Sequence, residues 1–233
     1  MTKSGYVNAV IRSSKSNEAY FFINDKYALL DYGVTGKSGG DKLLYGPTLV
    51  RDGFKSHAHT IFGSYGIDCA FDTDNNEAFI FYENFCALID YAPHSDKDKI
   101  ITGPKKIADM FPFFKGTVFE NGIDAAVRST VGKEVHLFKG DKYARIDYGT
   151  NRLVQGILYI TDSFEGFSGT FFEAGMDAAF ATHTANLAYI FKGDYYVAVS
   201  FTPGSSSNGT MLGPVARISK HWTALTALVP LKN

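Results

Sequence analysis

The chain has few of the residues that would make it a secreted disulfide scaffold. Its 233 residues include two cysteines, Cys69 and Cys86. Both lie in apolar surroundings, so we expect them to be reduced core thiols and the chain to be cytosolic. The first residues lead into a repeat without an apolar stretch long enough for a signal peptide or a membrane helix, which agrees with that expectation.

A surplus of charge of either sign is also missing. Lys and Arg number 23, Asp and Glu 24, and the formal net charge is -1. Nucleic acids and anionic membranes are bound through clustered basic faces, so we expect neither as a partner. Zinc-type Cys/His spacing, a nucleophile elbow and a metalloprotease helix are absent from the sequence as well. We therefore expect no catalytic residues and no enzymatic activity.

What the chain does have is a fourfold internal repeat, rich in its 20 Phe and 14 Tyr residues. The stretch Gly122-Ile123-Asp124-Ala125-Ala126 recurs as Gly66-Ile67-Asp68-Cys69-Ala70, as Gly175-Met176-Asp177-Ala178-Ala179 and, less closely, as Tyr6-Val7-Asn8-Ala9-Val10. The four acidic or amide positions are Asn8, Asp68, Asp124 and Asp177, at spacings of 60, 56 and 53 residues. Such a period indicates one small structural unit per repeat.

Each copy is followed by two runs of β-forming residues. In the third and fourth repeats these runs are joined by Lys139-Gly140-Asp141-Lys142 and Lys192-Gly193-Asp194, which predicts a hairpin. A polar segment comes next. Gly-Pro pairs at Gly46-Pro47, Gly103-Pro104 and Gly213-Pro214 then open a short amphipathic pattern, which predicts a helix of two or three turns. The third repeat lacks this pair, so its helix is less strongly indicated.

Four units of three strands, a short fourth strand and a helix fill the chain. One such sheet cannot bury both faces alone, whereas units arranged around an axis bury them against each other. The sequence therefore predicts an all-β fold, a single-domain four-bladed β-propeller with a short helix per blade and blades at about 5-62, 63-119, 120-172 and 173-231. The Asp-Ala-Ala strands, short and rich in small residues, are expected to be innermost. A linear solenoid is the alternative. The terminal repeats of a solenoid are normally atypical and polar, whereas the first and last repeats of this chain keep their apolar strands.

The repeated strand, the Phe-Lys-Gly-Asp-x-Tyr hairpins at 138–143 and 191–196 and the Gly-Pro segment resemble the haemopexin repeat. Across all four repeats, including Asn17-Glu18-Ala19-Tyr20 and Lys105-Lys106-Ile107-Ala108-Asp109-Met110-Phe111-Pro112, the chain is similar to the legume seed albumin-2 family. That resemblance implies a haemopexin-like propeller in a cytosolic seed protein. It also implies cations in the axial channel, spermine bound by a homodimer and haem bound by the monomer. Unlike secreted haemopexin domains, the chain has no cysteine near either end, so ring closure is expected to depend on packing and strand pairing.

Main-chain groups of the inner strands are the candidate ligands in the axial channel. If the four strands start together, the carbonyls of Asn8, Asp68, Asp124 and Asp177 form a ring suited to Ca²⁺ or Na⁺. A second ring is expected from the carbonyls of Val10, Ala70, Ala126 and Ala179. The amides between them, at Ala9, Cys69, Ala125 and Ala178, are candidates for holding chloride.

The side chains of the first ring have two possible roles. Three carboxylates and an amide at a channel mouth would attract a polyamine such as spermine, since opposite charges about 4 Å apart gain roughly 4 kcal/mol at an effective dielectric near 20. The alternative is that each side chain only accepts hydrogen bonds from nearby backbone, as Asp and Asn do in turns.

Haem ligation has no single candidate in the sequence. The chain contains six histidines, namely His57, His59, His94, His136, His183 and His221. His57 and His59 are expected in a polar loop, and His136 stands where the other repeats have Tyr or Phe, so a surface or packing role is favoured for each. The haem-binding residue stays unassigned.

The leading hypothesis is thus a non-enzymatic ligand-binding seed albumin. A carbohydrate-binding or defence protein that presents loops on one propeller face is a second hypothesis. Passive seed storage is a third, to which the low Cys, Met and Gln content lends no particular support.

Overall fold

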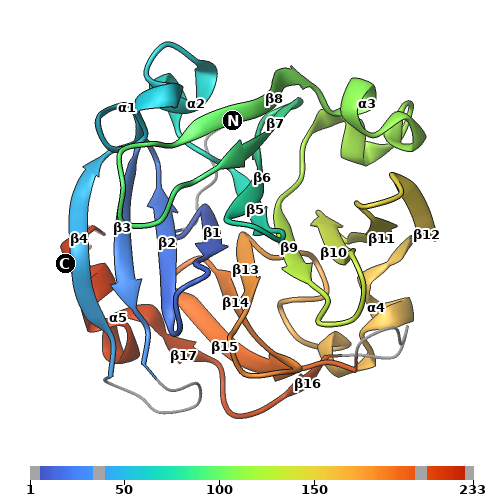
Figure 1. Cartoon of the computed structure of the whole chain (residues 1–233). Coiled ribbons are helices and arrows are strands. Elements are labelled where there is room, and N and C mark those ends of the chain that lie inside the picture. The colour runs from blue at the N-terminus through green and yellow to red at the C-terminus, as the bar shows by residue number, and fades with distance from the viewer. Residues whose placement is uncertain (1–5, 34–39, 203–208, 229–233) are drawn as a thin grey trace.

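Four separate antiparallel sheets surround a common centre in the computed structural model (Figure 1), which describes residues 6–33, 40–202 and 209–228. Blade 1 consists of β1 (Ala9–Arg12), β2 (Glu18–Ile23), β3 (Lys26–Asp31) and β4 (Lys42–Leu49). Blade 2 consists of β5 (Cys69–Asp72), β6 (Glu77–Tyr82), β7 (Phe85–Asp90) and β8 (Lys99–Lys106). Blade 3 consists of β9 (Ala125–Arg128), β10 (Glu134–Lys139), β11 (Lys142–Asp147) and β12 (Arg152–Tyr159). Blade 4 consists of β13 (Ala178–Ala181), β14 (Leu187–Lys192), β15 (Tyr195–Ser200) and the two-residue strands β16 (Thr210–Met211) and β17 (Ala216–Arg217), both paired with β15.

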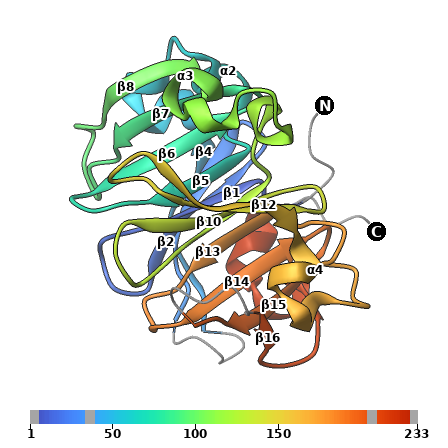
Figure 2. The ribbon, with the colours of Figure 1, turned by 90° about the vertical axis from the view of Figure 1, so that its right-hand side faces the viewer.

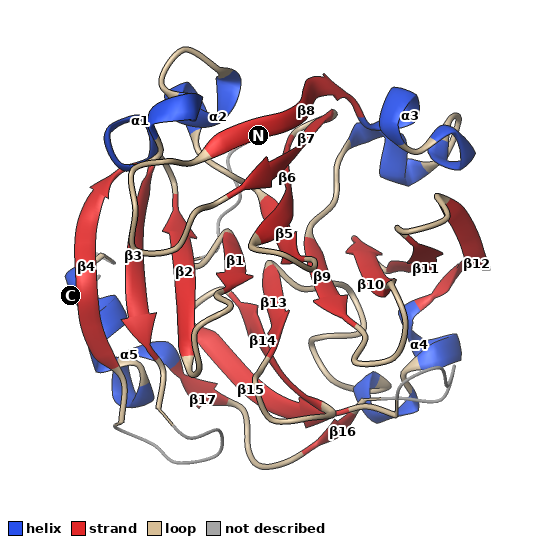
Figure 3. Cartoon of the chain, viewed as in Figure 1, coloured by secondary structure: helices blue, strands red, loops and turns tan. Residues whose placement is uncertain are grey.

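The expected four-bladed propeller is therefore confirmed, and the Asp-Ala-Ala strands are innermost (Figures 1 and 3). Within each blade the strands follow the chain order outward, because two-residue turns connect the second strand to the third. The first turn residue has a positive φ in every central hairpin, at Asn24, Glu83, Gly140 and Gly193. This conformation is the reason that glycine occupies two of the four positions.

Side chains of the strands pack in the spaces between blades. Alternate residues of a strand point to opposite faces, so each blade contributes one face to each of two neighbours. In β1, Val10 lies in the cluster shared with blade 4, whereas Ala9 and Ile11 lie in the cluster shared with blade 2. The other two clusters join blade 2 to blade 3 and blade 3 to blade 4. Figure 2 shows from the side how the sheets stack at these faces.

The ring closes between blades 1 and 4 through packing. Phe21 of β2 contacts Phe180, Phe191 and Trp222 of blade 4, with ring centroids 5.3 to 6.1 Å apart. Polar contacts add to this, since the Ala224 amide donates to Asp41 at 2.6 Å. Strand pairing, which the sequence also led us to expect, does not connect blades 1 and 4 among the described residues.

The helical segments are shorter than the sequence predicts. They are single turns, α1 (Val50–Gly53), α2 (Ile61–Tyr65), α3 (Ile107–Met110), α4 (Ile160–Ser163) and α5 (Ile218–His221), accompanied by 3-10 turns η1 (Lys55–His57), η2 (Pro112–Phe114), η3 (Val118–Asn121), η4 (Glu165–Phe167) and η5 (Thr223–Ala227). The first residue of the helix after the outer strand donates its amide to a carbonyl in the turn between the second and third strands. In blade 1 the Val50 amide donates to the Asp25 carbonyl at 2.8 Å. The helix of blade 3 therefore forms without a Gly-Pro pair.

The Gly-Pro pairs lie elsewhere than predicted. Gly46-Pro47 and Gly103-Pro104 are inside the outer strands β4 and β8, and Gly213-Pro214 lies between β16 and β17. An outer strand tolerates proline because one of its edges needs no ladder hydrogen bond. The prediction of a short fourth strand is wrong for three blades, because β4, β8 and β12 have eight residues each, and it is confirmed in blade 4, where β16 and β17 have two.

Both cysteines are buried thiols in the core, as the sequence predicts. Burial raises the pKa of the Cys86 thiol to about 12, so this residue is an inert core group. No helix within the described part of the chain is long and apolar enough to cross a membrane.

Candidate functional site

The backbone edges of the four inner strands line the axis. Each inner strand contacts its two neighbouring inner strands, and its side chains point into the spaces between blades. One edge of each inner strand pairs with the second strand of its own blade, and the other edge has no strand partner among the described residues. Main-chain groups, and not side chains, therefore face the centre. Figure 1 shows the four inner strands around it.

The register shows which main-chain groups these are. In blade 1 the Ser13 amide donates to the Glu18 carbonyl at 2.9 Å, and the Cα partners run back to Ala9 opposite Phe22. Because hydrogen-bonded and non-hydrogen-bonded pairs alternate in an antiparallel ladder, Ala9 bonds within its sheet, whereas Val10 turns its amide and carbonyl toward the axis. The same register holds in the other blades, where the amides of Thr73, Ser129 and Thr182 make the corresponding bond.

This alternation corrects one expectation. The amides of Ala9, Cys69, Ala125 and Ala178 were candidates for holding chloride, but they belong to the ladder of their own blade. The amides that face the axis are those of Val10, Ala70, Ala126 and Ala179, the residues predicted to form the second ring.

The strand starts have a fourfold irregularity at Asn8 and its counterparts. The Asn8 amide donates to the Phe22 carbonyl at 2.9 Å, although the Cα partner of Phe22 is Ala9. Asn8 and Ala9 of the inner strand thus face a single residue of the second strand, Phe22, as in a β-bulge. Asp68, Asp124 and Asp177 make the equivalent bond to Phe81, Phe138 and Phe191 at 2.8 to 2.9 Å.

The side chains of the first ring bind the backbone of their own hairpins. Asn8 Oδ1 accepts from the Asn24 amide at 2.7 Å, and Asp177 Oδ2 accepts from the Gly193 amide at 2.7 Å. Asp68 and Asp124 accept in the same way from Glu83 and Gly140. The backbone role weighed as the alternative is therefore present in all four blades. It anchors each strand start to the turn with positive φ.

Lysines also lie near these carboxylates. Lys139 Nζ is 2.9 Å from Asp124 Oδ1, and both side chains are only partly exposed. Burial lowers the pKa of Lys192, with the charge of Asp177 acting in the opposite direction. Within residues 6–33, 40–202 and 209–228 there is no cluster of three or more His, Cys, Asp or Glu side chains that could hold a metal. Main-chain oxygens are therefore the candidate ligands for a channel cation at these strands.

The opposite ends of the inner strands carry an ionic cluster that the repeat analysis overlooked. Arg12 of β1 and Arg128 of β9 both bind Asp72 of β5, at 2.7 and 3.1 Å. The Arg12 guanidinium also donates to the Thr182 carbonyl at 3.0 Å, which links blade 4 to the cluster. All four blades thus meet at this end of the axis. Comparing the residue four places after each Asn or Asp, which gives Arg12, Asp72, Arg128 and Ala181, would have identified the cluster from the sequence.

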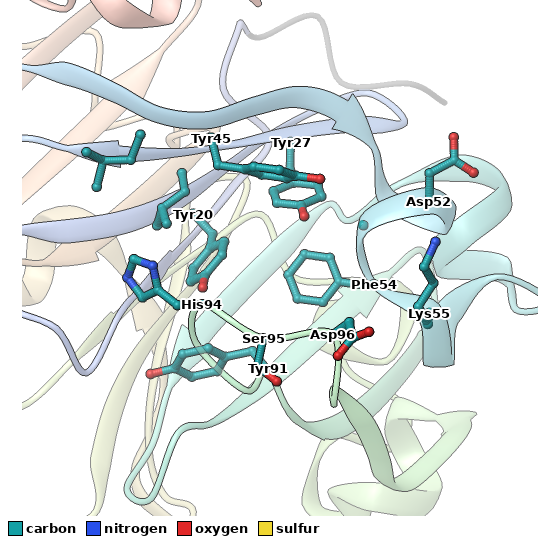
Figure 4. A pocket seen from close by; sticks show the side chains of 13 residues that line it. Tyr20, Tyr27, Tyr45, Asp52, Phe54, Lys55, Tyr91, His94, Ser95 and Asp96 are labelled. Carbon is teal, nitrogen blue, oxygen red and sulfur yellow. The ribbon is translucent and has the colours of Figure 1, made fainter.

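A crevice of about 500 Å³ opens between blades 1 and 2 (Figure 4). Aromatic rings of Tyr20, Tyr27, Phe54 and Tyr91 form its floor, and Tyr45 stands at its mouth with 53% of its surface exposed. Of the predicted site residues, only the candidate histidine His94 lies on this crevice. The sequence signal for the crevice is Gly53, a glycine where the other helices have larger side chains.

Five histidines have polar partners or packed surroundings. His57 is fully buried in η1, not in a polar loop as expected, with Nδ1 3.5 Å from Asp98. His94 binds Glu18 at 2.7 Å, and His183 accepts the Asn17 amide at 3.1 Å and contacts the Tyr32 hydroxyl. His136 is buried and bonds to Tyr143 at 2.9 Å, as a packing residue would. His221 packs on the Tyr196 ring.

Sequence comparison places these features in a family. A profile described as Hemopexin matches residues 123–169. Albumin-2 of Pisum sativum is 66% identical over 234 residues, covering all of both chains. The crystal structure of a Cicer arietinum albumin that shows haemagglutination is 67% identical with a TM-score of 0.93, and covers 98% of this chain and 100% of its own.

A second Cicer arietinum structure, described as a plant lectin with two metal binding sites, is 69% identical with a TM-score of 0.93 over 98% of this chain and 100% of its own. The repeat, the propeller and the full-length identity agree with one another. The chain belongs to the albumin-2 family of seed albumins, which have the haemopexin-like fold.

Proposed function

We propose that the protein is a cation-binding seed albumin whose ligands are main-chain carbonyls on the propeller axis. The first ring would consist of the carbonyls of Asn8, Asp68, Asp124 and Asp177, and the second of those of Val10, Ala70, Ala126 and Ala179. The observation that carries the proposal is the fourfold register, because it directs the main-chain groups of the second-ring residues away from their own sheets.

The chemistry of the donors fits a hard cation. Carbonyl oxygens suit Ca²⁺ or Na⁺, and Ca²⁺ takes six to eight oxygens, so four carbonyls leave positions for water. A description of two metal binding sites in a relative of 69% identity also supports the proposal. Chloride, if it binds on the axis, would meet the amides of the second-ring residues.

The experiment is a diffraction measurement on crystals grown with Ca²⁺ and on crystals grown with Na⁺ and a chelator. We expect an anomalous peak on the axis, level with the first ring, only in the Ca²⁺ crystals. A peak coordinated by side chains elsewhere, or an axis that contains only water at both salts, would rule out the carbonyl rings.

For ligands, we propose that a homodimer binds spermine at the channel mouth and that the monomer binds haem, in the cytosol of seed cells. The carboxylates of Asp68, Asp124 and Asp177 support the polyamine, although it would compete with Lys139 for Asp124. Calorimetry with spermine and with haemin, combined with sedimentation of each complex, tests both ligands and the assembly states.

Carbohydrate binding is a second candidate function, because the relatives of 67% and 69% identity are described as haemagglutinating and as a lectin. Erythrocyte agglutination inhibited by free sugars would support it. If spermine, haemin and sugars all give no heat in calorimetry, passive storage is the one of the three hypotheses that remains.

A further inference from the structure

Aromatic residues line the spaces between blades, and three of these spaces differ in how open they are. Between blades 1 and 2 the floor consists of Tyr20, Tyr27, Phe54 and Tyr91, and the crevice measures about 500 Å³. The counterparts between blades 4 and 1 are Tyr189, Tyr196, Trp222 and Tyr32, and the space that they line measures about 10 Å³. Between blades 2 and 3, where Phe79 and Tyr148 correspond to Tyr20 and Tyr91, the space measures about 170 Å³.

Gly53 lines the first of these spaces and differs from its counterparts in the other blades. The short helices of the four blades begin at equivalent residues, so their fourth positions are Gly53, Met110, Ser163 and His221. His221 packs on the Tyr196 ring with centroids 5.9 Å apart and lines the space between blades 4 and 1. A Cβ atom at Gly53 would instead overlap the Tyr27 hydroxyl, which lies against the bare glycine. The missing side chain thus leaves room for the Tyr27 ring, and this helix places no side chain of its fourth residue in the crevice.

Aromatic faces line the walls of the crevice. The centroids of Tyr27 and Tyr45 are 6.1 Å apart, and those of Tyr27 and Phe54 are 4.7 Å apart. Tyr45 is on β4 and stays 53% exposed, so its ring is available to a bound molecule. In Figure 4 the rings of Tyr20, Tyr27, Tyr45 and Phe54 surround one space.

Polar groups of both charges form the rim. Asp52 and Asp96 supply acceptors, Lys55 supplies a donor, and Ser95 supplies a hydroxyl that can do either. The His94 imidazole is already bound to Glu18 at 2.7 Å. An organic cation would meet Lys55, and an anion would meet two carboxylates. A neutral molecule with hydroxyl groups on its edge and an apolar face can use every one of these groups.

We propose that the crevice between blades 1 and 2 is a binding site for a neutral saccharide, whose ring stacks on Tyr45 and whose hydroxyls bind Asp52, Lys55 and Asp96. Its volume lies within the roughly 300 to 1,000 Å³ of small-molecule sites, and an aromatic wall with a few polar groups is typical of them. The proposal deepens the second candidate function, carbohydrate binding, and is independent of the axial channel.

Saturation-transfer NMR with a panel of methyl glycosides and disaccharides tests it. The proteins compared are the natural chain, Tyr45→Ala, Asp96→Asn and Gly53→Met, the last of which copies Met110 of blade 2. Tyr159→Ala is the matched control, because Tyr159 is 54% exposed on the outer strand of blade 3, away from the crevice. We expect at least one sugar to bind the natural chain and the control equally, and to bind Tyr45→Ala and Asp96→Asn about tenfold more weakly.

Gly53→Met should abolish binding, and circular dichroism establishes whether this variant folds. If it does not fold, Tyr45→Ala and Asp96→Asn still decide the outcome, because both side chains are exposed. Sugar binding that none of the crevice variants weakens would overturn the site and leave carbohydrate binding intact. A panel without any bound sugar, or a crevice whose tyrosine signals respond to choline or haemin instead, would overturn the ligand class.

Discussion

Arg12 and Asp72 occupy the same position in the inner strands of adjacent blades, and their side chains form an ion pair of 2.7 Å at one end of the axis. Arg128, the counterpart in blade 3, binds the same carboxylate at 3.1 Å. Only 7% of the Asp72 side chain is exposed, compared with 18% and 15% for the two arginines. One carboxylate therefore holds two nearly buried guanidinium groups together.

Removing this carboxylate should strongly destabilise the ring. In Asp72→Asn the two arginines keep their charges and lose the carboxylate that they share, although Arg128 keeps its contact with Asp74. Breaking a buried ion pair in this way costs about 3 to 5 kcal/mol. We expect a loss of about 3 kcal/mol in the free energy of unfolding, measured by urea denaturation at pH 7.

Asp74→Asn is the control for this change. Asp74 binds Arg128 as well, but 46% of its side chain is exposed, and exposed pairs contribute less than about 1 kcal/mol. Equal losses for the two variants would mean that burial of Asp72 is not the reason for its importance.

Asp98 should make the joint between blades 1 and 2 sensitive to acid. It accepts the amides of Lys55 and Ser56 at 3.0 and 2.9 Å and thereby caps η1. Burial alone would raise the pKa of Asp98, but hydrogen bonds from His57 and Ser56 outweigh it and lower the pKa to about 2. Since the folded pKa is below the ordinary value of 3.8, the stabilisation is complete above about pH 4 and is lost as the pH falls through 2.

The variant Asp98→Asn should lose about 1 to 2 kcal/mol of stability at pH 7, the usual contribution of a cap. Thermal unfolding of both proteins between pH 7 and pH 2 checks the sign, because the difference in Tm should shrink below pH 4. A difference that grows on acidification would contradict the role of the ionised carboxylate.

His136 should contribute acid sensitivity over a higher pH range. Burial lowers the pKa of its imidazole to about 3, and the charge of Arg145 acts in the same direction. The unfolded chain binds a proton near the ordinary value of 6.5, whereas the folded chain does not, so stability falls as the pH drops from 6.5 toward 3. The slope from this one group approaches about 1.4 kcal/mol per pH unit.

Replacing His136 by Phe, the residue at the equivalent position 79, removes that slope. At pH 7 two effects oppose each other, because the variant removes the buried Nε2 atom, which has no hydrogen-bond partner within the described part of the chain, but also removes the partner of the buried Tyr143 hydroxyl. We therefore expect the free energy of unfolding at pH 7 to change by less than about 1 kcal/mol. Urea titrations at pH 7 and pH 5 measure both effects. An unchanged pH dependence would show that the buried imidazole is protonated without cost.

Gly66→Ala should disrupt the contact between blades 1 and 2. Gly66 has φ of +97°, and a Cβ atom there would overlap the Asn24 carbonyl in the hairpin of the previous blade. Backbone strain and this overlap together should cost more than about 2 kcal/mol.

Gly116→Ala is the matched control, since Gly116 also has a positive φ, of +76°, but a Cβ atom there would meet nothing within 4 Å among the described residues beyond its chain neighbours. Similar losses in thermal denaturation would assign the cost to strain alone.

The sequence predicted the propeller because the fourfold pattern constrains the fold repeatedly. Period-two strands, hairpin turns and small inner residues such as Ala70 and Ala126 all agree with the observed sheets. The length of the helices was not predictable in the same way. Phe54 and its counterparts lie at helical spacing after Val50, yet the chain leaves the helix after one turn to pack these rings against the blade.

The axial channel and the crevice differ in how much of each could be predicted from the sequence. The positions around the axis follow from strand alternation, and the error in the amide positions could have been avoided in the same way, because the NH and CO groups of one residue point to the same side of a strand. The additional bond from the Asn8 amide to the Phe22 carbonyl, in contrast, cannot be predicted from periodicity. The crevice depends on tertiary packing around Gly53, where the missing side chain leaves room for the Tyr27 hydroxyl. Only the superposition of the four helices gives that glycine a meaning.

Asp124→Asn separates the two roles proposed for the first ring. Asparagine already occupies the equivalent position 8, where its Oδ1 atom accepts the Asn24 amide, so the variant should keep the bond to the Gly140 amide and the path of the strand. Ca²⁺ affinity should then change less than about threefold if the ligands are main-chain carbonyls, whereas spermine affinity should fall by up to about tenfold with the loss of one carboxylate. Calorimetry with each ligand measures both. Asp141→Asn, which removes an exposed carboxylate of the same hairpin, controls for net charge. Loss of Ca²⁺ binding in Asp124→Asn would instead mean that the carboxylates themselves are the ligands.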